Sequence, residues 1–370
     1  MLWAARICKD KTPSLLCRLS CFAAGIRHWV VFISIPVRDS FLKNVLQSNL
    51  APAHEYRPDI DGLRAIAVLS VVFFHAHVAG FAGGFAGVDI FYVISGYLIT
   101  SLVAHDIAFE RFSLVTFYER RIRRIFPALF GVLGFCTLAA CALFSPKDLA
   151  VFGKSVIATT LFVSNILFKR QAGPGGYFDS TSDLQVLLHT WSLSVEEQFY
   201  LLFPTTLLLL TRFAKARLIV LSAITLGSFL ISAWITPHRP LTAFYIFIPR
   251  AWELLIGSLL ALKAVVPLQR RASREIAGFV GLSFIGAAVF LFSRDTVFPG
   301  LAALVPCLGA WLIIYSGANG PSCVKSILSA QPLVFVGLIS YSLYLWHWPI
   351  LVFSRYFSAG ELSRPEYFFL

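Results

Sequence analysis

The feature that most constrains this chain is a regular series of apolar segments, each about as long as a membrane-spanning helix. A helix needs about 20 mainly apolar residues to cross the hydrocarbon core of a bilayer. Between the segments there is no stretch long enough for a soluble domain. The sequence therefore predicts an all-α, polytopic membrane helical bundle of about nine or ten transmembrane helices. The segments are 63–80, 87–105, 126–145, 148–168, 191–211, 218–236, 241–262, 276–293, 299–316 and 333–353.

The composition indicates a membrane protein and argues against a soluble domain and against a nucleic-acid-binding protein. Charged residues make up only 14% of the chain, against about 25% in a soluble domain. The formal net charge is +12, but the basic residues cluster between apolar runs, which is typical of loops that set membrane orientation. We therefore predict a lipid bilayer as the surroundings and no nucleic-acid partner. The cysteines form no C-x-x-C pair and no Cys/His set with metal spacing, so no metal site is expected.

The basic loops predict which ends of the helices lie inside. The loop 109–127 is rich in arginine, and the loops 211–217 and 268–275 are also basic, so all three are expected in the cytoplasm. Nine crossings satisfy this arrangement if 148–168 is re-entrant or peripheral; the alternative is ten crossings. The polar segment 169–185 then lies outside.

Two ionisable residues of the first segment stand on one helix face. Arg64 opens the segment, and His75 follows eleven residues later, which is almost three turns and roughly 16 Å along the axis. Such groups at membrane depth are functional candidates by default. A cation at the entrance and an imidazole deeper inside suit a path for an anionic substrate, although Arg64 alone also fits a helix-end anchor. His77 points the other way, so we expect an interfacial histidine there.

Three further charges occur in apolar surroundings. Asp89 begins the second segment, where a helix cap and a functional carboxylate are both reasonable. Arg250 and Glu253 lie three residues apart, on one helix face, where they can neutralise each other. We expect Arg250 to face the substrate and the two acids to serve the chemistry. The glycines of "GFAGGFAG" are expected to form a tight outer turn and to allow close helix packing.

Polar and aromatic residues alternate at the start of a later segment, in "LLHTWSLSVEEQFYLLFP". Aromatic rings stack on sugar faces, so the pattern indicates carbohydrate binding; an interfacial aromatic belt is the alternative. A third buried imidazole lies between two tryptophans in "ISYSLYLWHWPIL", where helix packing is the alternative. The residues assigned to substrate binding are His189, Trp191, Ser192, Glu196, Tyr200, Arg250 and His347.

Six motifs occur together in a fixed order and cover about 56–353. Together they resemble the acyltransferase-3 family of bacterial membrane O-acyltransferases. The motifs are "YRPDIDGLRAIAVLSVVFFH", "GGFAGVDIFYVISGYLIT", "FYERRIRRIFPAL", "HTWSLSVEEQFYLLFP", "PRAWELLIGSLLAL" and "ISYSLYLWHWPIL".

The resemblance implies roles for particular residues. The family's arginine and catalytic histidine fall on Arg64 and His75. Independently of the family, we expect Glu253, Asp89 or Glu196 to orient His75 in the way that a carboxylate holds a catalytic histidine, and the sequence does not choose among them. The family's R-x-x-R motif falls on either of two overlapping pairs, and the register stays open. The residues assigned to acyl-CoA binding are Arg64, Arg120, Arg121, Arg123 and Arg124.

The resemblance also implies an activity and a location. Family members take an acyl group, usually acetyl, from cytoplasmic acyl-CoA and transfer it to a hydroxyl of an outer glycan or glycolipid, such as lipopolysaccharide O-antigen. The expected location is the bacterial inner membrane, with acetyl-CoA as co-substrate and no permanently bound cofactor. A proton-coupled transporter and an inactive truncated acyltransferase are the alternatives.

The resemblance divides the chain into three parts. Residues 1–55 form an N-terminal extension, 56–355 form the membrane acyltransferase domain, and 356–370 form a C-terminal stub. Many members continue with one more helix and an extracytoplasmic hydrolase-like domain. We expect this chain to be truncated before that helix.

Overall fold

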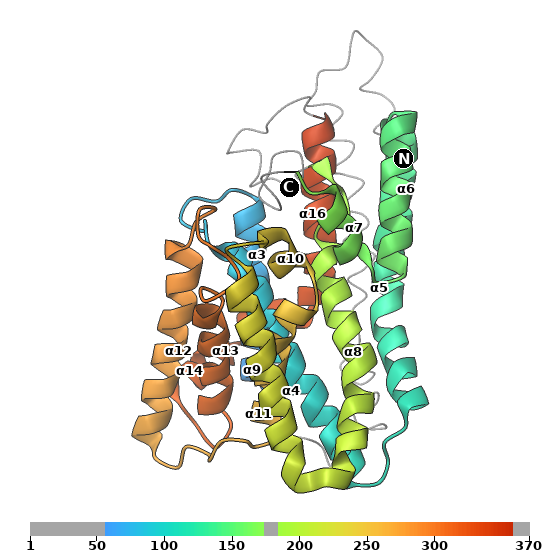
Figure 1. Ribbon diagram of the computed structural model, residues 1–370. Helices are drawn as coiled ribbons and strands as arrows, with labels where there is room; N and C mark the ends of the chain where they lie inside the picture. The colour runs from blue at the N-terminus through green and yellow to red at the C-terminus, as the bar shows by residue number, and fades with distance from the viewer. Residues whose placement is uncertain (1–55, 174–183, 358–370) are drawn as a thin grey trace, which may run out of the picture. The chain divides into compact units, whose positions relative to one another are not determined.

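The computed structural model describes residues 56–173 and 184–357, and within them the regular secondary structure is entirely helical (Figure 1). The helices are α3 (Pro58–His75), α4 (Gly87–Ala108), α5 (Leu114–Leu143), α6 (Pro146–Thr160), α7 (Ser164–Gln171), α8 (Thr190–Leu210), α9 (Ala214–Ile235), α10 (Pro240–Tyr245), α11 (Ala251–Ala261), α12 (Arg271–Leu291), α13 (Leu304–Ser316), α14 (Cys323–Leu328), α15 (Gln331–Leu338) and α16 (Ser340–Phe357), with the short 3-10 helices η2 (Gly84–Ala86), η5 (Thr211–Phe213) and η6 (Ile248–Arg250). The predicted all-α bundle is confirmed. The predicted extension 1–55, the stub after 357 and the middle of the polar segment 169–185 lie outside the described residues.

Several helices are long and apolar enough to cross a membrane. Among the described residues there are four such helices, namely η2 with α4, then α5, α9 and α12. The pair α15 and α16 adds a fifth when it is counted as one span bent by 66°. These helices make the chain a multi-pass membrane protein.

The prediction of nine or ten crossings stays a prediction, because the structure divides three of the predicted segments, one of which is 333–353, shared between α15 and α16. The segment 148–168 breaks between α6 and α7, where Phe162 adopts a left-handed backbone with φ 54°. The segment 241–262 becomes α10, η6 and α11, with Pro249 inside η6. Apolar composition alone does not predict where a helix breaks, whereas a proline indicates such a break.

The three basic loops gather at one end of the bundle. The connections from α4 to α5, from α8 to α9 and from α11 to α12 all lie at the lower end in Figure 1. We call this the basic end. The same three loops were predicted to share the cytoplasmic side, and the topology brings them together as that prediction requires.

Glycines allow the most extensive helix contacts. The helices α4 and α11 pack against each other over much of their length. A Cβ atom at Gly96 would lie 1.8 Å from the carbonyl oxygen of Leu254, and one at Gly257 would lie 2.1 Å from that of Val93. Small residues let helix backbones approach closely where no water drives association. This crossing brings Asp89 of α4 next to the start of α11.

The glycine-rich turn after α3 packs as predicted. A Cβ atom at Gly84 would lie 2.1 Å from the Ser70 carbonyl oxygen, and one at Gly87 would lie 2.3 Å from that of Ala67. The helix α3 contacts α4, α15, α16 and α14, and Leu63 on it is fully buried. A central helix therefore carries both Arg64 and His75.

Candidate active site

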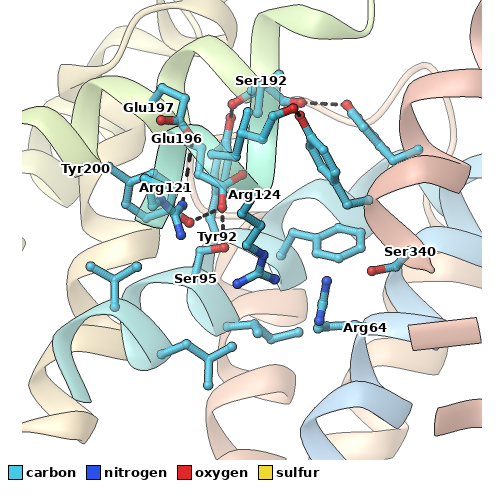
Figure 2. Close-up of a pocket in the computed structure, with 18 of the residues that line it drawn as sticks. Arg64, Tyr92, Ser95, Arg121, Arg124, Ser192, Glu196, Glu197, Tyr200 and Ser340 are labelled. Carbon is cyan, nitrogen blue, oxygen red and sulfur yellow. Dashed lines mark hydrogen bonds and ion pairs between the residues drawn. The ribbon is translucent and has the colours of Figure 1, made fainter. Parts of the chain in front are cut away.

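A cavity of about 340 Å³ opens among α3, α4, α5, α8 and α16. Its charged side chains are four arginines and two glutamates, so positive charge is in excess. We call it the arginine pocket. Its polar lining residues, most of which are drawn in Figure 2, are Arg64, Tyr92, Ser95, Arg120, Arg121, Arg124, Ser192, Glu196, Glu197, Tyr200, Ser340, Tyr341 and Tyr344.

The arginines come from the basic end of two helices. Figure 2 shows Arg64 from α3 and Arg124 from α5 pointing into the same central space. Arg121 lies 3.7 Å from Glu197 and stacks over the ring of Tyr200 at 3.4 Å from its centre. Several guanidinium groups that line one pocket attract an anion, and arginine pairs bidentately with phosphate.

The structure distinguishes the two registers of the R-x-x-R motif. The side chain of Arg123 is 77% exposed and pairs with Glu119 at 2.8 Å. Arg120 lines the pocket, but its side chain is 53% exposed. Arg121 has a side chain that is only 14% exposed, and Arg121 and Arg124 both line the pocket. The geometry therefore favours the second pair for anion binding.

Glu196 lies in the pocket wall beside Arg121 and Tyr200 (Figure 2). Its Oε1 atom accepts hydrogen bonds from the hydroxyl groups of Ser95 and Tyr200. Both donors belong to the pocket lining. These two hydrogen bonds of Glu196 lie within the pocket wall. Its predicted substrate-binding and orienting roles stay predictions.

The inner end of the pocket is formed by Ser192 and Tyr344. Their hydroxyl oxygens are 2.5 Å apart, and the Tyr344 hydroxyl donates to the carbonyl of His189 at 2.9 Å. The ring of Tyr344 lies 5.6 Å from that of His189 and 5.4 Å from that of His347, measured between centroids. Tyr344 therefore touches the pocket on one side and a group of histidines on the other.

Three buried histidines from different helices meet beside this inner end. His75 ends α3, His189 precedes α8, and His347 lies in α16. His75 Nδ1 lies 2.9 Å from His347 Nε2, and the ring of His189 lies 5.7 Å from that of His347. We call these three residues the imidazole cluster. Trp348 packs edge-on against His75, with ring centroids 4.6 Å apart.

His77 occupies a different environment from His75. It lies after the helix end in a left-handed backbone conformation, with φ 54°, and is exposed. Arg355 Nη2 lies 3.4 Å from His77 Nε2 and donates to the carbonyl of His75 at 3.1 Å. The predicted difference between the two histidines is therefore reflected in their burial.

Asp89 and Glu253 lie in a separate cluster around Arg250. Arg250 Nη1 donates to Asp89 at 2.9 Å and to Glu253 at 2.8 Å, and all three residues are fully buried. We call these residues the ion triad. The predicted catalytic roles of both acids, and the predicted substrate contact of Arg250, stay predictions; the contacts found join them to each other.

The two carboxylates of the ion triad and the nearby thiol of Cys307 could together hold a metal ion. Oxygens of Asp89 and Glu253 and the sulfur of Cys307 lie within 4.8 Å of one another. Arg250 already supplies the positive charge that a metal ion would bring to the two carboxylates. We therefore describe this cluster as an ion pair network.

The aromatic residues predicted to bind a sugar divide into two groups. Trp191 is only 2% exposed and packs on Phe244 and Tyr245, with Arg250 5.6 Å from its ring centre. Tyr200 instead lines the arginine pocket. Both side chains are therefore directed into the bundle.

His347 of α16 was assigned from the sequence, but Ser340 and Tyr344 on the same helix, both of which line the pocket, were missed. Ser340, Tyr344 and His347 recur at intervals of four and three residues, so they share one helix face. That periodicity was a readable signal within "ISYSLYLWHWPIL". Ser95 gave no comparable signal, because its partner Glu196 is 101 residues away in the chain.

Comparison with known proteins gives a match over most of the chain. Residues 57–370 match a family described as an acyltransferase domain. The chain is 33% identical over 331 residues to the O-acetyltransferase OatA of Staphylococcus aureus (strain NCTC 8325 / PS 47), covering 85% of this chain and 54% of that protein. It is 35% identical over 332 residues to the peptidoglycan O-acetyltransferase OatA of Listeria monocytogenes serovar 1/2a, covering 85% and 52%. The chain spans about half the length of these relatives, and no solved structure matches it.

Proposed function

The chain belongs to the acyltransferase-3 family, and we propose that it is a membrane O-acetyltransferase that uses acetyl-CoA. The acetyl group is transferred to a hydroxyl of an extracytoplasmic glycan. The observation that carries this proposal is the continuity from the arginine pocket, through Tyr344, to the imidazole cluster.

The arginine pocket suits the phosphates of the donor. Arg64, Arg121 and Arg124 present guanidinium groups at the basic end, where a cytoplasmic anion arrives. The apolar side chains of the lining suit the thin pantetheine arm, so the thioester is directed toward Ser192 and Tyr344. The same buried surroundings keep water away from the thioester.

The imidazole cluster suits general base catalysis. A neutral His75 accepts the proton of the acceptor hydroxyl while that oxygen attacks the thioester carbonyl. The carbon–sulfur bond then breaks, and the departing CoA sulfur takes the proton from His75. The products are an acetyl ester and free CoA, and the histidine returns to its starting state.

The acceptor is proposed as a glycan of the bacterial cell envelope. The Listeria relative is described as a peptidoglycan O-acetyltransferase, which favours that polymer; lipopolysaccharide O-antigen is the second acceptor to be tested. We propose the inner membrane as the location, because the proposed donor is cytoplasmic acetyl-CoA and either acceptor lies outside.

The test uses inside-out membrane vesicles that contain the full chain, so the cytoplasmic face receives acetyl-CoA labelled in its acetyl group from outside, while the glycan acceptor is loaded into the vesicle lumen. We expect alkali-labile label on added envelope glycan, with peptidoglycan fragments and O-antigen glycolipid supplied in separate reactions. Label on neither acceptor, with free CoA not released, would overturn the proposal. Uptake of a solute without label transfer would favour the transporter instead.

A further inference from the structure

The protonation of His347 follows from its hydrogen-bond partner. His347 Nδ1 lies 2.6 Å from the carbonyl oxygen of Tyr344, one turn earlier in α16. A carbonyl oxygen only accepts hydrogen bonds, so Nδ1 carries the proton. A charged imidazole at membrane depth is costly, so the ring is neutral and its Nε2 atom is an acceptor.

The protonation of His75 follows in turn. Its Nδ1 atom lies 2.9 Å from the acceptor Nε2 of His347, so His75 Nδ1 is the donor of this hydrogen bond. A neutral imidazole carries one proton. His75 Nε2 is therefore the nitrogen that can accept a proton from a substrate.

We infer that His347 is the positioning residue of His75, and that it selects Nε2 of His75 as the basic atom. The inference deepens the proposed function and rests on it for its catalytic consequence. When His75 takes the substrate proton on Nε2, its Nδ1–H stays bonded to His347, which supports the positive charge that forms. In a serine protease a carboxylate has this place beside the histidine.

The carboxylates predicted for this role have other partners. Asp89 and Glu253 bond to Arg250, and Glu196 bonds to Ser95 and Tyr200. A neutral imidazole also avoids the cost of a second charge beside His75 within the membrane.

His189 differs from His347 in its contacts. Neither of its ring nitrogens makes a hydrogen bond of ordinary geometry among the described residues. His189 therefore packs beside the pair without selecting its tautomer.

The first test measures the tautomer itself and does not depend on activity. The full chain is labelled with ¹⁵N-histidine in lipid nanodiscs, and the His75 signals are assigned by their loss in His75→Asn. We expect a single tautomer protonated at Nδ1 in the wild type and a mixture of tautomers in His347→Leu. Protonation at Nε2 in the wild type, or an unchanged His75 spectrum in His347→Leu, overturns the inference.

The second test measures acetyl transfer by three variants. In His347→Leu we expect kcat to fall about 100-fold with the KM for acetyl-CoA unchanged, because an orienting partner acts on the chemical step. His347→Gln should stay within about tenfold of wild type, since its amide can donate to Tyr344 and accept from His75.

The matched control is His238→Leu, which should not change either constant. His238 is an exposed histidine whose Nδ1 also lies against a helix carbonyl, that of Trp234, at 2.7 Å. Equal losses in His347→Leu and His347→Gln, or wild-type kcat in His347→Leu, overturn the inference. Absence of acetyl transfer by the wild type overturns the proposed function instead, and the tautomer measurement then decides the inference alone.

Discussion

The ion triad and the imidazole cluster are both buried polar groups of this bundle, yet they are built in opposite ways. In the ion triad, one guanidinium is bonded to two carboxylates at full burial. In the imidazole cluster, three rings, from the end of α3, from the residue before α8 and from α16, meet through one hydrogen bond and several ring contacts. Charges bonded this tightly resist rearrangement, whereas neutral imidazoles can gain and lose protons. We therefore expect the first cluster to hold α4 to α11 and the second to perform the proposed chemistry.

Removing the arginine of the ion triad should have the largest effect on stability. In Arg250→Met, Asp89 and Glu253 remain buried without their partner, which costs about 3–5 kcal/mol. We expect little folded protein in membranes and an earlier unfolding transition in detergent, measured by thermal denaturation. Arg274→Met is the control, because Arg274 bonds only to the carbonyl groups of Leu268 and Gln269 among the contacts found.

Replacing the whole ion triad distinguishes structure from catalysis. The variant Asp89→Leu, Arg250→Met, Glu253→Leu removes all three charges together, which is often neutral for stability. If the ion triad only holds the helices, this variant folds and transfers acetyl groups. A folded triple variant with no acetyl transfer would instead support the catalytic roles predicted for the two acids.

Removing the proposed base should have the next largest effect, now on activity alone. General acid–base catalysis contributes about 10²–10⁴-fold, so we expect kcat of His75→Ala to fall about 10³-fold. The thermal transition should shift much less than in Arg250→Met. The measurement is initial acetyl transfer at saturating acetyl-CoA.

The matched control for His75→Ala is a variant of His77, two residues away. His77→Ala removes an exposed imidazole outside α3, and acetyl transfer should stay close to wild type. If the two variants lose activity equally, the prediction that only His75 takes part in the chemistry is wrong.

The sequence predicted the parts of this structure that depend on one segment. Apolar length indicated the helices, and the helical period placed Arg64 and His75 on one face of α3. The segment 148–168 was predicted to be re-entrant or peripheral, but the position of its break was not predicted, because the left-handed turn at Phe162 has no glycine or proline to indicate it.

Contacts between distant segments could not be predicted in the same way. His75 and His347 are 272 residues apart, and Asp89 and Arg250 are 161 apart. The two R-x-x-R registers have identical spacing, so only the position of Arg124 in the pocket lining distinguishes it from the exposed Arg123. Sequence spacing therefore identified candidate site residues, and the tertiary contacts show which of them lie together.

The arginines of the pocket should act on donor binding more than on chemistry. In Arg124→Ala we expect the KM for acetyl-CoA to rise about tenfold with kcat nearly unchanged, because a charge-assisted hydrogen bond contributes about 1.5–3 kcal/mol. Arg123→Ala is the control, since that side chain is 77% exposed and pairs with Glu119. A fall in kcat with unchanged KM would move Arg124 from binding to chemistry.

Tyr344 lies at the border between the arginine pocket and the imidazole cluster, so its variant should have the smallest effect. Tyr344→Phe keeps the ring against His347 but removes the hydroxyl that bonds Ser192 and the His189 carbonyl. A neutral hydrogen bond contributes about 1 kcal/mol, so we expect kcat to fall about fivefold.

The companion variant Ser192→Ala tests whether that loss comes from the same hydrogen bond. It removes the other hydroxyl of the 2.5 Å contact, and the double variant should lose no more activity than Tyr344→Phe alone, because coupled residues are not additive. A loss in Tyr344→Phe as deep as that of His75→Ala would show that the phenol takes part in proton transfer. The chemistry would then begin at the inner end of the pocket and not at the imidazole pair.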